Sequence, residues 1–303
     1  MRYVLITPAR NEESFLGATI RSVIAQRHRP CRWVIVSDGS TDRTDDIVRA
    51  AILDHAWIHL IRMPEHRDRD FAAKVACFRA AYETVRDLDF DLIGNLDADI
   101  TFDPDYFAFL ISRFEENPRL GVAGTPFREG TMQYDYRFTS AQHVSGAVQL
   151  FRRECYVAIG GYVPIRGGGV DLVAVTMARI HGWQTRSFTE KHCVHHRKMG
   201  TADTTALGSQ FRMGQKDYRL GWHPLWELFR SAYQMCRRPY IIGGLILFAG
   251  YIYGALKHSD RPVSPEFVAF VRAEQINRLR YFFKLASPTD TPVSHRISET
   301  ADT

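Results

Sequence analysis

The chain has 303 residues, and its 45% hydrophobic and 24% charged residues are typical of a globular protein with one large or two small domains. Its net charge of +5 is mild. Because the basic residues are spread along the chain, they exclude a nucleic-acid-binding run and indicate only a weak attraction to diphosphates or phospholipid surfaces. The five cysteines are widely spaced without a Cys-x-x-Cys pair, which argues against a zinc site and favours a reducing compartment.

The first hundred residues alternate between apolar runs and helical patterns. Strands are expected at 3–7, 33–37, 58–62 and 90–96, and helices up to about residue 26, at 43–53 and at 71–86. Ser40 or Thr41 is expected to cap the second helix. Strands that alternate with helices predict an α/β fold with a mostly parallel, Rossmann-like sheet flanked by helices, whose ligands bind at the carboxyl ends of the strands.

Polar residues follow three of these strands. The segment 8–12 follows the first strand, Asp38 follows the second, and Asp97 and Asp99 follow the fourth. In an extended chain residues i and i+2 point the same way, so the carboxylates of Asp97 and Asp99 can converge, and a bound Mg²⁺ or Mn²⁺ shared with a diphosphate would relieve their repulsion. Each cluster is also compatible with an ordinary turn or helix start. Their common position at one sheet edge favours a nucleotide site.

Three motifs carry a family resemblance. In chain order they are Thr-Pro-Ala-Arg-Asn-Glu-Glu at 7–13, Ser-Asp-Gly-Ser-Thr-Asp at 37–42 and Leu-Asp-Ala-Asp at 96–99. In residues, order and spacing the chain resembles the family 2 glycosyltransferases of the GT-A fold over about residues 1–200, and the recurrence of several motifs makes the resemblance specific. It implies a nucleotide-sugar donor, with a UDP-linked sugar as the leading candidate, and a divalent cation.

The resemblance also implies roles for individual residues. The nucleotide pocket would be lined by Pro8, Ala9, Arg10 and Glu12. Asp38 would hold the base, while Asp97 and Asp99 would flank the metal and the diphosphate. Lys74 stands where the family often presents a polar or basic contact to the donor, with a solvated helix lysine as the alternative.

A further carboxylate follows the glycine run 167–169. Asp171 begins a predicted helix that ends near residue 181. The resembled family places its general base as the second acid of a Glu-Asp pair here, and this chain reads Val170-Asp171, a departure at the first position only. An inverting transfer needs a carboxylate that takes the proton of the acceptor hydroxyl, so Asp171 is the predicted base, with helix capping as the alternative.

A basic cluster at 192–197 follows a strand expected at 185–189. One of its histidines could be a further metal ligand, and Arg197 could neutralise phosphate. Because adjacent residues of an extended chain point to opposite sides, only one of His195 and His196 is expected to reach inward, and His195 is the candidate ligand. A solvated surface cluster is the alternative.

The segment 240–256 is seventeen residues without a charge, between Arg237-Arg238 and Lys257. Seventeen residues are at the short limit for a spanning helix, and the basic residues on both sides resist translocation. The pattern favours re-entrant or monotopic insertion from the cytosolic side, with amphipathic helices at 222–237 and 265–285 beside it. A tilted span stays open, as does a helix packed on protein through Gly250-x-x-x-Gly254.

These patterns predict a GT-A catalytic domain at 1–205, a helical membrane-associated region at 206–285 and a disordered tail at 286–303. Because no secretory signal precedes the first strand, we expect a peripheral or monotopic protein at the cytoplasmic face of the cell membrane. The predicted function is inverting, metal-dependent sugar transfer to an acceptor, with a lipid-linked saccharide as the leading acceptor. The alternatives are a polyprenyl-phosphate sugar transferase and, from another class, a non-catalytic membrane-associated nucleotide-binding protein.

Overall fold

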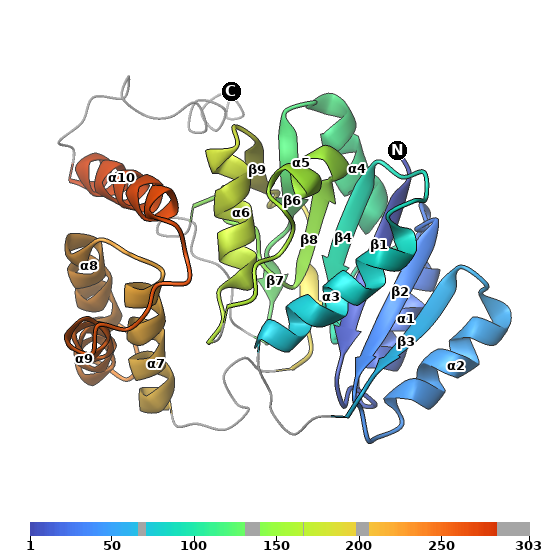
Figure 1. Cartoon of the computed structure of the whole chain (residues 1–303), viewed down its shortest axis with the longest axis horizontal. Coiled ribbons are helices and arrows are strands. Elements are labelled where there is room, and N and C mark those ends of the chain that lie inside the picture. The colour runs from blue at the N-terminus through green and yellow to red at the C-terminus, as the bar shows by residue number, and fades with distance from the viewer. Residues whose placement is uncertain (66–70, 131–139, 166, 198–205, 284–303) are drawn as a thin grey trace. The chain divides into compact units, whose positions relative to one another are not determined.

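The computed structural model describes residues 1–65, 71–130, 140–165, 167–197 and 206–283 (Figure 1). The chain divides into two compact units, Met1–Lys198 and Met199–Thr303. The tail expected at 286–303 lies outside the described residues.

The first unit is built on a seven-stranded sheet of order β3-β2-β1-β4-β8-β6-β9. Its strands are β1 (Tyr3–Ala9), β2 (Arg32–Asp38), β3 (Ile58–Met63), β4 (Leu92–Leu96), β6 (Leu120–Gly124), β8 (Val148–Arg152) and β9 (Gln184–Ser187). All neighbouring pairs are parallel except those of β8, which runs antiparallel to β4 and β6. The predicted mixed α/β architecture with a mostly parallel sheet is therefore confirmed.

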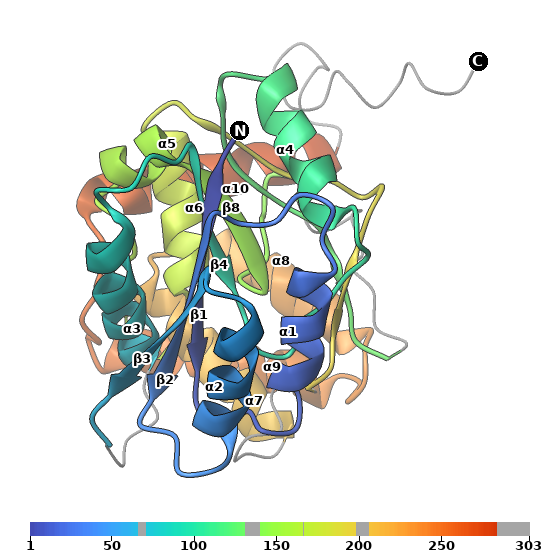
Figure 2. The same cartoon turned by 90° about the vertical axis from the view of Figure 1, so that its right-hand side faces the viewer.

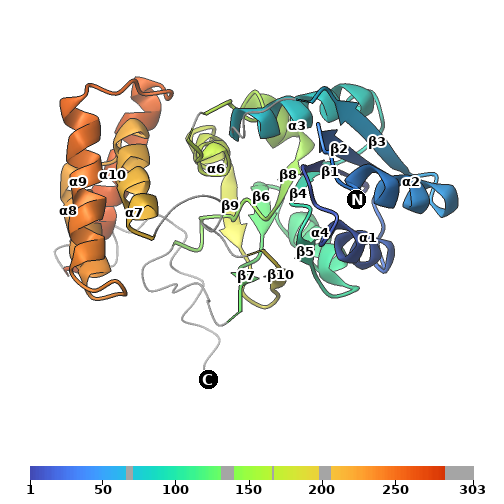
Figure 3. The same ribbon diagram turned by 90° about the horizontal axis from the view of Figure 1, so that it is seen from below.

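Helices cover both faces of this sheet. They are α1 (Leu16–Ile24), α2 (Thr44–Asp54), α3 (Phe71–Val85), α4 (Tyr106–Glu116), α5 (Arg153–Ala158) and α6 (Val170–Ile180). Helices α1, α2 and α4 lie on one face and α3, α5 and α6 on the other (Figures 2 and 3). Strands covered on both faces need apolar side chains throughout, which explains why β1 and β4 are buried along almost their whole length.

Two details of the first unit differ from the sequence expectations. Strand β1 continues to Ala9, so Pro8 and Ala9 pair with Val36 and Ser37 of β2 instead of lying in a loop. The capping prediction for the second helix was wrong, because the N-cap is Arg43 and no side chain caps the helix. The backbone N–H of Thr44, its first residue, donates to the carboxylate of Asp42 at 3.0 Å.

A second, three-stranded sheet joins distant parts of the first unit. Strand β10 (Cys193–His195) runs antiparallel to β5 (Ile100–Thr101) and parallel to β7 (Phe127–Arg128). The backbone N–H of His196 also donates to the carbonyl of Asp99 at 3.0 Å. This small sheet therefore holds the histidine cluster beside the residues that follow β4.

The second unit is helical. It contains α7 (Ala206–Arg219), α8 (Pro224–Met235), α9 (Ile242–Leu256) and α10 (Pro265–Phe282), and α9 packs against α7 and α8. The His223 imidazole and the Ser264 hydroxyl cap α8 and α10, each followed by a proline that suits the first helical turn. None of the helices described, in either unit, has the length and apolar character needed to cross a membrane.

Candidate active site

The carboxyl ends of β1, β2 and β4 meet at one edge of the sheet, because β1 pairs in parallel with both neighbours. Arg10 follows β1 directly, and Asp38 is the last residue of β2. The Arg10 guanidinium lies 4.0 Å from an Asp38 carboxylate oxygen. Cys77 of α3 approaches Asp38 from the neighbouring helix. Burial, followed by the charge of Asp38 and a hydrogen bond to it, raises the pKa of the Cys77 thiol to about 12. The Cys77 thiol is therefore neutral and lies beside Asp38, the residue expected from the resemblance to hold the nucleotide base.

Hydrogen bonds fasten the loop after β1 to the loop after β2. Asn11 adopts a left-handed backbone conformation with φ of 54°, its N–H donates to the Ser40 hydroxyl at 3.1 Å, and its side-chain carbonyl accepts from the N–H of Thr41 at 2.9 Å. The backbone N–H of Glu12 donates to the Thr44 hydroxyl at 2.8 Å. Asparagine tolerates the left-handed region better than most residues. The loops that carry Arg10 and Asp38 thus form one rigid frame.

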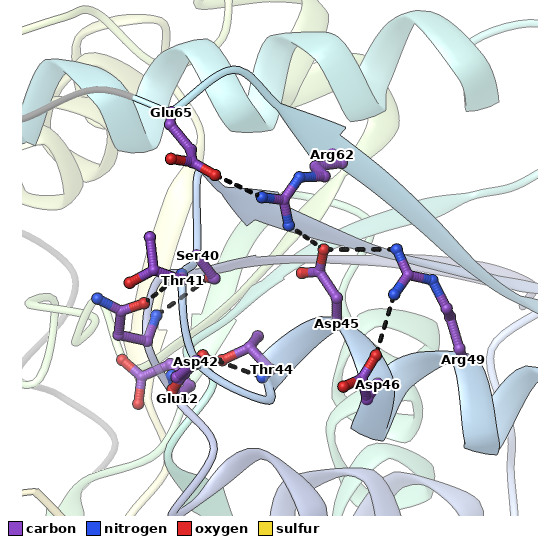
Figure 4. A network of polar contacts seen from close by, with 11 residues as sticks. Glu12, Ser40, Thr41, Asp42, Thr44, Asp45, Asp46, Arg49, Arg62 and Glu65 are labelled. Atoms are coloured by element: carbon purple, nitrogen blue, oxygen red, sulfur yellow. Dashed lines mark hydrogen bonds and ion pairs between the residues drawn. The ribbon is translucent and has the colours of Figure 1, made fainter.

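Ion pairs extend this frame into α2 and β3 (Figure 4). The Arg62 guanidinium contacts Asp45 and lies 3.0 Å from Glu65, while Arg49 lies 3.1 Å from Asp46. Asp45 is buried, so its pairing with Arg62 anchors the start of α2 behind the Asp38 loop.

Lys74 and Asp97 form the centre of the site. The ammonium of Lys74 on α3 lies 2.5 Å from the Oδ1 atom of Asp97, which follows β4. Burial lowers the pKa of the Lys74 ammonium, but the charges of Asp97, Asp171 and Asp99 outweigh burial and the pKa is raised. Lys74 is therefore a fixed cation among three carboxylates.

Asp99 has different partners from Asp97. Its Oδ2 atom lies 3.6 Å from Nε2 of His195 and 3.9 Å from Nε of Arg197. Burial and the negative charge of Asp97 raise the pKa of Asp99, and the neighbouring His195 and Arg197 act in the opposite direction. The Nδ1 atom of His195 faces Glu129 at 3.5 Å. The two aspartates are thus electrostatically coupled, but one is paired with a lysine and the other faces an imidazole.

A divalent cation would suit the pair of Asp99 and His195. A carboxylate oxygen and an imidazole nitrogen face each other there, and both are ordinary ligands of such an ion. No group of three or more histidine, cysteine, aspartate or glutamate side chains with metal-binding geometry occurs in the part of the chain that the structure describes. A cation at this place would take its remaining ligands from a substrate diphosphate or from water.

Arg197 connects Asp99 and His195 to the loop that follows β1. Its guanidinium lies 2.5 Å from the Glu12 carboxylate and over the ring of Phe15 at 5.5 Å. Neighbouring His196 shares a hydrogen bond of 2.8 Å with the Thr101 hydroxyl, so it points away from Asp99 while His195 points toward it. The alternation expected for adjacent residues of an extended segment is observed.

Asp171 is the second residue of α6. The N-cap is Gly169, whose φ of 100° is left-handed, and no side chain caps this helix. The capping interpretation of Asp171 is therefore wrong. Its carboxylate instead packs on the backbone of Gly146, where an added Cβ would come within 2.9 Å of Oδ2. The Asn95 amide fixes the Gly146 carbonyl at 2.8 Å, so Asp171 is held beside β4 with its carboxylate near Lys74.

The comparison with protein families decides what kind of protein this is. Residues 4–196 match the family described as "Glycosyl transferase family 2". The chain belongs to this family. The matched region contains every residue of the site except Arg197, which follows it directly, and the resemblance read from the three motifs is confirmed.

Relatives at the sequence level cover a part of this family 2 chain. Over 117 residues it is 27% identical to the poly-beta-1,6-N-acetyl-D-glucosamine synthase of Staphylococcus aureus and 29% identical to that of Staphylococcus epidermidis. The matched stretch is 38% of this chain and 26% of each synthase. The chain therefore spans about a quarter of the length of these curated relatives.

Solved structures share the fold of the chain. The mannosyltransferase PcManGT from Pyrobaculum calidifontis, in complex with GDP-Man and Mn²⁺, superposes with a TM-score of 0.58 at 16% identity, over 95% of this chain and 81% of that chain. Residues 1–349 of TarS from S. aureus, in complex with UDP-GlcNAc, superpose with a TM-score of 0.54 at 14% identity, over 95% of this chain and 82% of that chain. The predicted GT-A fold is confirmed.

Sequence reasoning on this family 2 chain did not identify three residues of the site. Cys77 and Asn11 are of types that ordinarily occupy cores and turns, so their types give no signal. Glu129, which faces His195, lies just after a two-residue strand, too short to leave a periodic pattern. The presence of Asn11 in the first motif was the one available hint.

Proposed function

We propose that this protein transfers a sugar from a nucleotide-diphosphate donor to an acceptor hydroxyl with inversion at the anomeric carbon. The observation that carries the proposal is the grouping of Asp99 with His195, and of Asp171 with Lys74, at the end of β4. One pair suits a cation that holds a diphosphate, and the other presents a carboxylate to an acceptor. The GDP-Man and Mn²⁺ bound by PcManGT, and the UDP-GlcNAc bound by TarS, support a donor of this class.

The donor nucleotide would lie along the joined loops after β1 and β2. Pro8 and Ala9 end β1 beside the pocket, Arg10 and Asp38 supply charged groups for the nucleoside, and Glu12 is held in place by Arg197. A UDP-linked sugar is the leading donor. Because Arg197 already balances Glu12 and faces Asp99, it supplies positive charge at the place where a diphosphate would approach the cation.

Asp99 and His195 would hold the divalent cation. When bound, the cation stabilises the negative charge that develops on the departing nucleoside diphosphate. A site with one carboxylate oxygen and one imidazole nitrogen favours a transition ion such as Mn²⁺ over Mg²⁺, because nitrogen ligands raise the affinity for the former. The ion pair with Lys74 leaves Asp97 free to accept bonds from the donor sugar through its second oxygen.

Asp171 would act as the general base. Its carboxylate is half-buried, does not cap α6, and packs on the Gly146 backbone. It would take the proton of the acceptor hydroxyl while the diphosphate departs. For the acceptor we propose a lipid-linked saccharide at the cytoplasmic face of the cell membrane.

The test is a panel of nucleotide sugars incubated with the purified protein and Mn²⁺ or Mg²⁺, with nucleoside diphosphate release as the readout. Cation-dependent release from one donor supports the proposal, and Asp171→Asn should then keep donor binding and lose transfer. A non-catalytic binding protein would hold UDP and Mn²⁺ and release nothing from any donor. Membrane extracts then serve as the source of acceptor. Formation of a monosaccharide-phospholipid would indicate that the acceptor is a polyprenyl phosphate and not a lipid-linked saccharide.

A further inference from the structure

Helix α9 of the second unit exposes its large apolar side chains. Together with the exposed Ala249 they form one stripe along the helix, which we call the outer stripe of α9: Ile242, Leu245, Ala249, Ile252, Tyr253 and Leu256. Leu245 is 53% exposed and Leu256 is 75% exposed. A helix at the surface of a soluble domain ordinarily turns such residues inward.

The inner face of α9 is made mainly of glycines. Gly243, Gly244, Gly250 and Gly254 are buried, with Leu247 and Tyr251 between them. A Cβ added to Gly250 would collide with the carbonyl oxygen of Phe211 on α7, and one added to Gly244 with that of Ser231 on α8. The helix backbones therefore touch. Small residues between helices and large aliphatic residues outside are the arrangement that helices adopt in lipid.

Charge is confined to the two ends of α9. The segment 240–256 carries no charged residue, whereas Arg237 and Arg238 precede it and Lys257 follows it. The Arg237 guanidinium lies over the ring of Tyr233 at 4.5 Å and the Lys257 ammonium over that of Tyr253 at 5.9 Å. Basic groups with aromatic rings at both ends of an apolar stripe complement the phosphates of an anionic bilayer surface.

The length of α9 decides its orientation toward such a surface. Its 15 residues extend about 22 Å, whereas a spanning helix must cross about 30 Å of hydrocarbon. Both ends are basic, so both belong at the same side of a membrane. At the first end Ile241 is 61% exposed and has a positive φ of 58°, a strained conformation for a β-branched residue.

We infer that α9 binds the surface of an anionic phospholipid bilayer. It lies in the plane of the interface with its outer stripe among the acyl chains and with Arg238 and Lys257 on lipid phosphates. Membrane binding through α9 would bring the protein to the lipid-linked acceptor of the proposed function. Because membrane binding is measured without sugar transfer, failure of the membrane inference would leave the proposed function intact, and the reverse also holds.

The experiment is co-flotation of the full chain with vesicles of phosphatidylcholine, with and without phosphatidylglycerol. The first variant is Leu245→Gln with Ile252→Gln, and its matched control is Leu53→Gln, which changes an 86% exposed leucine of α2. Because these side chains are exposed, folding should be unaffected. We expect the double variant to lose binding to anionic vesicles by roughly tenfold or more and the control to bind as the parent does.

The second variant, Arg238→Ala with Lys257→Ala, tests the charge. It should weaken binding to anionic vesicles and remove the salt dependence of binding, while nucleoside diphosphate release in detergent is unchanged. Equal binding of the first variant and its control would overturn the inference. So would a parent protein that ignores vesicles but dimerises through Leu245 and Ile252, as seen by sedimentation, because a second copy would then cover the stripe.

Discussion

Lys74 and Asp97 are joined by an ion pair of 2.5 Å, although one side chain comes from α3 and the other follows β4. This ion pair gives the two aspartates of the Asp-Ala-Asp motif different surroundings. Asp97 is neutralised by a cation that the protein itself supplies, and Asp99 is left to face His195 at 3.6 Å. A cation bound between Asp99 and His195 would therefore meet the positive charge of Lys74 nearby.

Lys74→Met should tighten Mn²⁺ binding in the absence of donor, roughly threefold to tenfold, because it removes a like charge from the neighbourhood of the cation. Transfer should fall at the same time, since Asp97 loses the partner that orients it. Lys74→Arg keeps the charge and serves as the control for Mn²⁺ affinity. Calorimetric titration of Mn²⁺ measures the effect, and an unchanged affinity in the Met variant would show that Lys74 does not act on the cation.

Asp99→Asn should lower Mn²⁺-dependent UDP affinity by roughly tenfold or more, because an amide oxygen is a much weaker ligand than a carboxylate. The substitution keeps the size of a buried side chain, so the melting temperature should change little. UDP affinity measured without metal is the internal control and should not change. If the variant binds UDP and Mn²⁺ as tightly as the parent, the assignment of Asp99 as a ligand is wrong.

The fold was predictable because its signals are local and long. The segments that became β1, β2 and β4 are mainly apolar and buried along almost their whole length, as strands covered on both faces must be, and each is followed by polar residues. The parallel order then brings those residues to one edge, so the common position of Asp38, Asp97 and Asp99 was predictable from the sequence.

The other features of the site depend on contacts between distant residues, which leave no local pattern in the sequence. The partnership of Lys74 with Asp97 depends on how α3 packs, and that of His195 with Asp99 on strands of two or three residues. The sequence left a helix packed through Gly250-x-x-x-Gly254 as one alternative for 240–256, and the packing of Gly250 on Phe211 and of Gly254 on Tyr218 shows that these small residues do face inward. Capping was the alternative interpretation of Asp171 because helix starts favour Asp, but the N-cap of this helix is Gly169 and no side chain caps it.

Asn11→Ala should destabilise the first unit by about 2 kcal/mol, about half from the lost hydrogen bond to Thr41 and half from a left-handed alanine. Asn11→Gly loses the same hydrogen bond but accepts the backbone conformation, so it should be destabilised less. Both variants should weaken UDP binding, because the loop of Arg10 is no longer tied to that of Asp38. Chemical denaturation and UDP titration measure the two effects, and equal stability of the Ala and Gly variants would exclude a contribution from backbone strain.

Glu227 should make the second unit less stable as the pH rises. Burial and the charge of Asp217 raise the pKa of Glu227 to about 8, against the opposing charge of Arg230, and neither carboxylate oxygen has a hydrogen-bond partner among the described residues. The folded state thus keeps a proton that the unfolded chain releases near its usual pKa of 4.5. The stabilisation is complete below that pKa and is lost as the pH rises through the folded pKa.

Glu227→Gln cannot ionise, so its melting temperature should exceed that of the parent at pH 9 and depend less on pH between 5 and about 9. Glu266→Gln, at an exposed site of α10, is the control. Burial also raises the pKa of Asp217, so a smaller pH dependence in the same direction should remain. A parent protein whose second unit melts at the same temperature across this range would contradict the assignment.

Asp171→Asn separates catalysis from structure. Because Gly169 occupies the N-cap and Asp171 caps nothing, the amide should alter stability by well under ~1 kcal/mol, the remaining effect being the lost charge in the first turn of α6. The amide cannot accept a proton at neutral pH, so transfer should fall by roughly 10²- to 10⁴-fold. UDP affinity should stay at the parental value, because the nucleotide and cation are left to Asp38 and Asp99. Melting temperature, UDP affinity and transfer rate measured on one preparation decide the matter, and near-normal transfer would move the search for the base to another carboxylate or to a histidine.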